Sequence, residues 1–86
     1  MGKIMFFTSP TCSRCRNVKK QIEVLKASEC FDMIDITTDR GETLAETYSV
    51  SSLPTLVLIK NGKTEDRIET VVLPKDLKLI IEKSKE

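Results

Sequence analysis

The chain has 86 residues, which is enough for one domain, and 40% hydrophobic with 31% charged residues is a globular rather than a disordered composition. Its 14 basic and 13 acidic residues leave a formal net charge of +1, so no global field favours binding to nucleic acid or to a membrane. Three cysteines and no histidine are a poor basis for a disulfide-stapled secreted scaffold.

The first half of the chain alternates between short apolar runs and one long helical pattern. Residues 3–8, KIMFFT, are almost continuously apolar, which favours a strand that is covered on both faces. After the break Ser9-Pro10-Thr11, apolar residues three and four apart predict a helix from Cys12 to about Ala27. Its apolar positions are Cys15, Val18, Ile22 and Leu25. Residues 31–36 predict a second strand.

The second half begins with a polar break at residues 37–41 and a short helix at about 41–48, with Leu44, Ala45 and Tyr48 on one side. Residues 56–59 predict a buried strand. Asn61-Gly62 then favours a two-residue hairpin turn, because both positions tolerate a positive φ angle. Residues 63–70 are polar enough to be an edge strand.

The last predicted element is a helix that opens at Leu73-Pro74, since proline suits the first turn of a helix. Three apolar residues face the core, namely Leu77, Ile80 and Ile81, and the final EKSKE is expected to be solvated. The whole order is strand, helix, strand, helix, strand, strand, helix. It predicts an α/β fold class with a four-stranded mixed sheet, because strands joined by helices pair in parallel and the hairpin adds an antiparallel edge.

The chemistry of the chain centres on Cys12 and Cys15, which are separated by two residues at the start of the first predicted helix. Unpaired N–H groups and the positive end of the helix dipole stabilise a thiolate there and can lower its pKa from ~8.5 to ~3.5–7.5. Arg14 and Arg16 act in the same direction. We therefore expect Cys12 to carry more thiolate at neutral pH.

The two sulfurs are not equivalent on a helical wheel. Cys15 lies about 40° and Cys12 about 100° from the centre of the apolar stripe, so Cys15 is expected to be buried and Cys12 exposed. Positions three apart on a helix are ~5–6 Å apart at Cβ, which permits a disulfide after a small movement. One exposed attacking thiol and one shielded resolving thiol suit disulfide exchange.

Other readings of the cysteine pair stay open at this point. A zinc site usually has four Cys or His ligands, and only Cys30 could add one here. A cluster shared by two chains is a further alternative. A purely structural disulfide would close a loop too short to remove much entropy from the unfolded chain. A redox-active dithiol is the reading we adopt, with no metal expected.

The CxxC pair at a helix start, followed some forty residues later by SSLPTLVLIKNGK, resembles the thioredoxin superfamily over essentially the whole chain. The short length is similar to glutaredoxins and small thioredoxin-like proteins. The resemblance implies a thioredoxin-like fold, with Cys12 as attacking nucleophile and Cys15 as resolving thiol. It also implies that Pro54 is a cis-proline beside the dithiol and that Leu53 offers its backbone to an extended substrate.

The sequence departs from the family pattern at several positions. Thr11 replaces a typical Trp, Ser13-Arg14 replace Gly-Pro, and Phe6 stands in the register of a buried Asp that assists proton transfer. Asp35 is the one substitute we suggest for that Asp. The ETVVLPKD segment lacks the glycine pair with which glutaredoxins bind glutathione.

These observations together predict a thiol–disulfide oxidoreductase that serves electron transport and cell redox homeostasis. Its expected partners are disulfide-containing proteins and a recycling reductase or small thiol, contacted through Thr11, Arg14, Leu53 and Pro54. We expect no cofactor besides the redox-active disulfide, no nucleic-acid or membrane partner, and a monomer. The alternatives are a glutaredoxin that acts with glutathione and a non-catalytic adaptor or metal-binding module.

The absence of a signal-peptide pattern adds the expectation of a cytoplasmic protein with one domain over residues 1–86, because the apolar run Ile4 to Phe7 is shorter than the ~7–15 residues required. Cys30 is expected to be a small buried residue. Tyr48 is expected to pack its helix on the sheet. The basic residues of the first predicted helix form either a solvated face or a positive rim around Cys12; they are Arg14, Arg16, Lys19 and Lys20.

Overall fold

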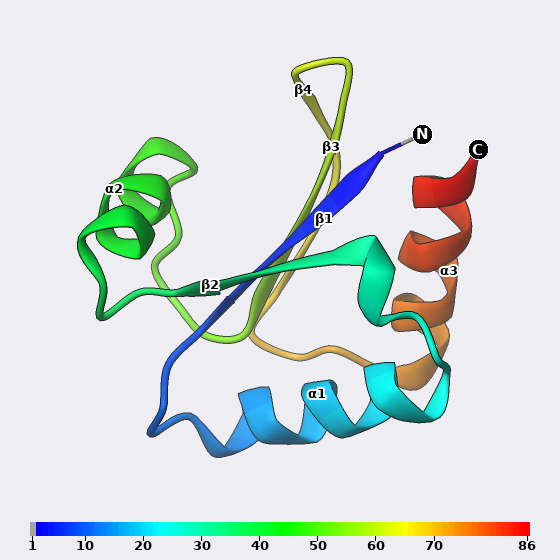
Figure 1. The fold of residues 1–86 in the computed structure, drawn as a ribbon, viewed down its shortest axis with the longest axis horizontal. Coiled ribbons are helices and arrows are strands. Elements are labelled where there is room, and N and C mark those ends of the chain that lie inside the picture. The colour runs from blue at the N-terminus through cyan, green and yellow to red at the C-terminus, as the bar shows by residue number, and fades with distance from the viewer. Residues whose placement is uncertain (1) are drawn as a thin grey trace.

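The computed structural model describes residues 2–86, which form three α-helices around a four-stranded sheet (Figure 1). The strands are β1 (Lys3–Thr8), β2 (Phe31–Asp35), β3 (Thr55–Lys60) and β4 (Lys63–Glu69). The helices are α1 (Ser13–Val24), α2 (Asp39–Thr47) and α3 (Pro74–Lys85), with a 3-10 turn at Ser28–Cys30. The strand order is β2-β1-β3-β4. The predicted fold class and element order are therefore confirmed.

The sheet is mixed, as the element order requires. β1 pairs in parallel with β2 across the α1 crossover and antiparallel with β3, which in turn pairs antiparallel with β4. The hairpin turn places Asn61 at φ 52° and Gly62 at φ 76°, in agreement with the predicted two-residue turn. β4 lies at the edge of the sheet, also as predicted.

The core has two layers because both faces of the sheet are covered (Figure 1). On one face, Ile4 and Phe6 of β1 pack in a cluster with buried residues of α1 and α3. On the other face, Met5 and Phe7 pack with residues of α2. Alternation along β1 thus feeds both layers, and its five residues from Ile4 to Thr8 are all buried.

Several predicted boundaries were wrong by a few residues. α1 ends at Val24 rather than near Ala27, because the N–H groups of Leu25, Lys26 and Ala27 close a C-terminal turn and Lys26 takes a positive φ of 53°. α2 begins at Asp39 rather than 41, since the Thr38 hydroxyl caps it by accepting the Gly41 N–H. The 3-10 turn before β2 was not predicted.

The end of the chain is less solvated than the sequence suggests. Ser84 is buried, its hydroxyl donates to the carbonyl of Ile81, and its own carbonyl accepts the N–H of Gly2 at 2.7 Å. These bonds tie the last turn of α3 beside the beginning of β1, so the two ends of the chain lie close together (Figure 1). Among residues 2–86, no helix combines the length and the apolar character that crossing a membrane requires.

Candidate active site

The turn between β1 and α1 holds Cys12 just outside the helix, as its N-cap residue. Cys12 has extended backbone angles, φ −88° and ψ 107°, and its N–H donates to the carbonyl of Ser9 at 3.3 Å. The sulfur of Cys12 accepts the N–H of Cys15 at 3.2 Å. The prediction that Cys12 lies within the first helical turn was wrong by one position. As the N-cap, its sulfur takes the place of the hydroxyl or carboxylate oxygen that usually accepts such an N–H.

A disulfide joins Cys12 to Cys15, with their Cα atoms 5.2 Å apart. Cys15 is only 1% exposed and belongs to the core cluster beneath α1, whereas Cys12 is half-buried at the edge of that cluster. The difference in burial follows the helical wheel, because Cys15 shares the apolar stripe of Val18 and Ile22. A reagent from solvent therefore reaches the sulfur of Cys12 more readily than that of Cys15.

The second part of the site is the turn before β3, where the Leu53-Pro54 peptide bond is cis and Pro54 is buried. The carbonyl of Pro54 accepts the N–H of Thr70 at 2.8 Å. The hydroxyls of Ser52 and Thr70 lie 2.7 Å apart, and the hydroxyl of Thr55 donates to the carbonyl of Ser52. The proline turn is thus fastened to the segment that follows β4.

Arg67 of β4 holds the segment that leads from α2 into this turn. Its guanidinium donates to the carbonyls of Tyr48 and Ser49, which close the C-terminal end of α2, and it also pairs with Glu69. Positive charge at the C-terminal end of a helix is favourable, because the dipole is negative there. The bonds from Arg67 and Thr70 together hold residues 49–54 against β4.

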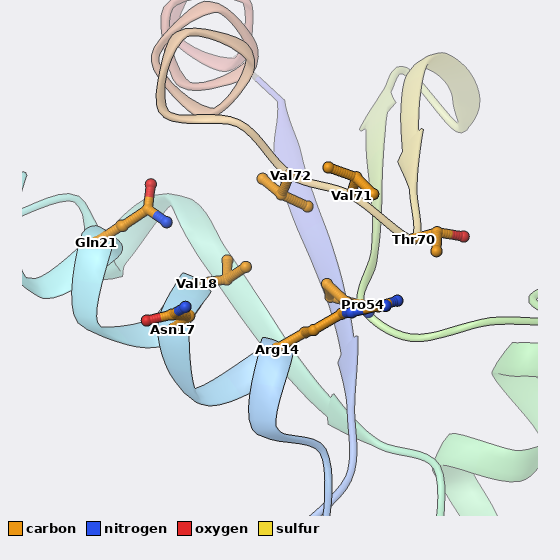
Figure 2. A pocket seen from close by; sticks show the side chains of 8 residues that line it. All are labelled: Arg14, Asn17, Val18, Gln21, Pro54, Thr70, Val71 and Val72. Carbon is orange, nitrogen blue, oxygen red and sulfur yellow. The ribbon is translucent and has the colours of Figure 1, made fainter.

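A groove of about 230 Å³ lies between α1 and the proline turn (Figure 2), and it adjoins the dithiol through Arg14, which stands between the two cysteines in the sequence. Figure 2 shows its side chains arriving from three segments: α1, Pro54 and the stretch between β4 and α3. The residues that line it are Arg14, Asn17, Val18, Gln21, Pro54, Thr70, Val71 and Val72. Val71 is 59% exposed, so the groove offers an apolar surface to solvent.

The structure brings only part of the predicted substrate set to this groove. Arg14 and Pro54 line it, whereas Thr11 is exposed on the turn before α1 and Leu53 packs between the two core layers. The sequence did not single out residues 70–72 as lining residues. The β3–β4 hairpin carried the needed signal, because in an antiparallel pair the end of β4 lies beside the start of β3, so the chain that leaves β4 must pass the proline turn.

Arg14 is the one charged residue among those that line the groove, so the site is locally positive. All four basic residues named for α1 are exposed. The carboxylate of Asp35, suggested as a proton acceptor for Cys15, is hydrogen-bonded to Thr37. The hydroxyl and the N–H of Thr37 donate to its carboxylate, which lowers the pKa of Asp35 below its ordinary value and makes it a weaker base.

Two other predicted residues have the structural roles expected of them. Cys30 is a free, buried thiol in the core cluster on the α1 side. The ring centroids of Tyr48 and Phe7 lie 6.4 Å apart, and this contact packs the end of α2 on the sheet. Within residues 2–86, no three Cys, Asp or Glu side chains gather in a way that could hold a metal ion.

Comparison with known proteins gives the same result as the geometry. The family model described as Thioredoxin matches residues 3–83. The chain belongs to the thioredoxin family. Over 68 residues it is 31% identical to the thioredoxin of Porphyra purpurea, a match covering 77% of this chain and 61% of that protein. The chain thus spans about three fifths of the length of the first curated relatives it matches.

Solved thioredoxin structures share the fold over nearly the whole chain. Thioredoxin-2 of the malaria parasite, described as a component of its protein secretion machinery, superposes with a TM-score of 0.81 at 28% identity. That match covers 96% of this chain and 82% of the other. A mutant thioredoxin from Halobacterium salinarum has a TM-score of 0.78 at 26% identity, covering 99% of this chain and 75% of the other.

Proposed function

We propose that the chain is a thiol–disulfide oxidoreductase that reduces disulfide bonds in proteins. The observation that supports this most is the unequal setting of the two sulfurs, one half-buried at a helix N-terminus and one fully buried below it. Thiol–disulfide exchange through a mixed disulfide needs one thiol that reaches the substrate and a second that attacks only after the first has reacted.

In the first step, the thiolate of Cys12 attacks one sulfur of the substrate disulfide. A Cys12–substrate S–S bond forms, the substrate S–S bond breaks, and the released sulfur takes up a proton. In the second step, Cys15 loses its proton and attacks the sulfur of Cys12, which releases the second substrate thiol. The dithiol becomes the Cys12–Cys15 disulfide, so two electrons pass to the substrate, whose two sulfurs take up the proton lost by Cys15 and one proton from solvent.

The residues around the dithiol serve each step. The N–H of Cys15 and the start of α1 stabilise the negative charge on Cys12, and Arg14 adds a positive charge nearby. The groove beside Pro54 accommodates the chain that flanks the substrate disulfide. The resemblance to thioredoxins adds the backbone of Leu53, next to Pro54, as a partner for an extended segment. Thr11 contributes from the exposed turn before Cys12.

The catalytic cycle requires a partner that restores the dithiol, either a reductase or a small thiol. We propose that residues 1–86 form one domain that acts as a monomer in the cytoplasm, where structural disulfides are rare and a CxxC pair is more often catalytic or metal-binding. No cofactor beyond the redox-active cysteine pair enters this scheme. Its role is electron transport to protein disulfides in cell redox homeostasis.

The test is reduction of insulin by dithiothreitol in the presence of the chain. Cys12→Ser should abolish the catalysed rate, while Cys15→Ser should accumulate a mixed disulfide between Cys12 and insulin. Cys30→Ala is the matched control and should keep the rate. A Cys12→Ser variant as active as the unchanged chain would refute the proposal. If only a glutathione mixed disulfide is reduced, the chain acts as a glutaredoxin instead.

A further inference from the structure

A second pocket, of about 360 Å³, lies between α1 and the start of α3. Its lining surface is mostly apolar and comes from Asn17, Lys20, Gln21, Val24, Leu25, Pro74 and Lys78. Val24 is 80% exposed and Leu25 is 37% exposed, although both are hydrophobic. Apolar side chains that line a concave surface offer a site for a single apolar group of another molecule.

This pocket is continuous with the groove beside the dithiol. Asn17 and Gln21 line both of them. Along α1, positions 17, 21 and 24 follow one another at helical spacing and therefore share one face, which lies away from the buried stripe, since Val24 is nine residues or about 180° from Cys15. A molecule that occupies the groove can therefore extend past Asn17 and Gln21 into the pocket along the surface of α1.

The charge around the pocket selects the kind of molecule that fits. Two of its lining residues, Lys20 and Lys78, are exposed cations, and none of them is a carboxylate. Arg14 adds a further positive charge in the adjoining groove. An apolar centre with a positive rim is complementary to an apolar side chain flanked by acidic residues, and such charges chiefly raise the rate of association.

We propose that this pocket binds an apolar side chain, flanked by Asp or Glu, on the same protein whose disulfide Cys12 attacks. The inference rests on the proposed function and adds a substrate class to it. From Cys12 to Val24 the helix rises by about 18 Å, which an extended chain spans in about five residues. The preferred substrate thus carries its acid-flanked apolar residue roughly five positions from the reacting cysteine.

A second copy of this chain fits the surface less well. The apolar part of the pocket consists of Val24, Leu25 and Pro74, which is a small area against the ~800 Å² that each partner buries in a stable complex. A single side chain of a transient partner needs no larger surface. Dimer formation at this face would therefore contradict the proposal.

The test uses peptides that carry one cysteine as a mixed disulfide with thionitrobenzoate, whose release is followed by absorbance. One set has Asp-Leu-Glu five residues from the cysteine, on either side of it, and the matched set has Ser-Gly-Ser there. The unchanged chain, mixed in its reduced form, should react with the better Asp-Leu-Glu peptide with a second-order rate constant about fivefold higher than with its Ser-Gly-Ser partner. The ratio should fall as salt is raised, because exposed charges are screened.

Substitutions in the pocket test whether its residues cause the preference for the Asp-Leu-Glu peptide. Val24→Ser, Lys20→Glu and Lys78→Glu should each bring the ratio of the two peptides toward one. Leu79→Ser and Lys63→Glu are the controls and should leave it unchanged, because Leu79 is an exposed leucine that lines a different hollow and Lys63 lies in the hairpin. Equal rates for the two peptides, or a ratio that these three substitutions do not change, would overturn the proposal.

A peptide that binds but cannot be reduced tests the binding surface independently of the proposed function. An Asp-Leu-Glu peptide with serine in place of cysteine should shift the amide resonances of Lys20, Val24 and Leu25, whether or not the chain reduces disulfides. Such shifts without any catalysed reduction of insulin would refute the function and keep the binding surface. An absence of shifts, or the same shifts produced by raising the concentration of the chain alone, would refute the surface.

Discussion

The N–H of Cys15 donates a hydrogen bond to the sulfur of Cys12 at 3.2 Å. The sulfur of Cys12 therefore caps α1 by accepting the N–H of Cys15. The sulfur of Cys15 itself lies beneath Cys12 in the core. A bond from an N–H to sulfur is strongest when the sulfur is negative. The same arrangement in the reduced chain favours the thiolate of Cys12, which is the form that attacks a disulfide.

Arg14→Glu should raise the pKa of Cys12. Arg14 is exposed in the first turn of α1, one of the two residues between the cysteines, so reversing its charge removes a stabilising cation and adds a repelling anion. We expect this rise in pKa to appear as a shift of the thiolate absorbance at ~240 nm to higher pH when the reduced chain is titrated. Lys63→Glu, in the hairpin at the other end of the sheet, is the control. An unchanged titration in Arg14→Glu would show that the helix alone sets this pKa.

Gly41→Ala should destabilise the fold. A Cβ atom on Gly41 would lie 1.8 Å from the carbonyl oxygen of Asp35, so α2 and the end of β2 would have to separate. Alanine gains about 1 kcal/mol over glycine in a free helix, but the clash should produce a net loss of about 2 kcal/mol in the free energy of unfolding, measured in urea.

Gly62→Ala is the matched control for that substitution. Gly62 has a φ angle of 76°, yet nothing lies within 4 Å of the Cβ that it would gain. Its cost is therefore backbone strain alone, about 1 kcal/mol. If Gly41→Ala proved as stable as the unchanged chain, the close contact between α2 and β2 would be wrong.

The ion pair of Asp66 and Lys83, 2.9 Å apart, should make stability depend on pH at both extremes. Partial burial alone would raise the pKa of Asp66, but hydrogen bonds from Lys83 and from the N–H of Arg67 bring it below 3.8. The same hydrogen bond, with the charge of Asp66, raises the pKa of Lys83 above 10.5.

The two shifted pKa values make the ion pair lose its stabilising effect in acid and in alkali. The contribution of Asp66 is complete above its unfolded pKa and is lost as the pH falls through its lower folded value. That of Lys83 is complete below its unfolded pKa and is lost as the pH rises through its higher folded value. The stability difference between the unchanged chain and Asp66→Asn should therefore be largest near neutral pH and shrink at both ends. A difference that is constant with pH would exclude the pair.

The element order and the dithiol could be predicted from local signals. The spacing of Cys15, Val18 and Ile22 predicted which sulfur is buried, and Asn61-Gly62 predicted the hairpin, because both features depend only on neighbouring residues. The cis form of the Leu53-Pro54 bond was different. It came from the resemblance to thioredoxins, since most X-Pro bonds are trans.

Features that depend on contacts between distant segments were missed. The burial of Ser84 arises from α3 packing beside Gly2, and the groove combines α1 with residues 70–72, which only the sheet order brings together. The extension of α2 back to Asp39 depends on the Thr38 hydroxyl, a capping signal that is readable in the sequence but was not used.

The most direct test of the whole account is alkylation of the fully reduced chain. A limited amount of iodoacetamide at about pH 7 is followed by mass-spectrometric location of the label. Cys12 should react first and most rapidly, while Cys15 and Cys30, both buried in the core, should remain unlabelled until the chain is unfolded. Labelling of Cys15 at the same rate as Cys12 would contradict the division of the pair into an attacking and a resolving thiol.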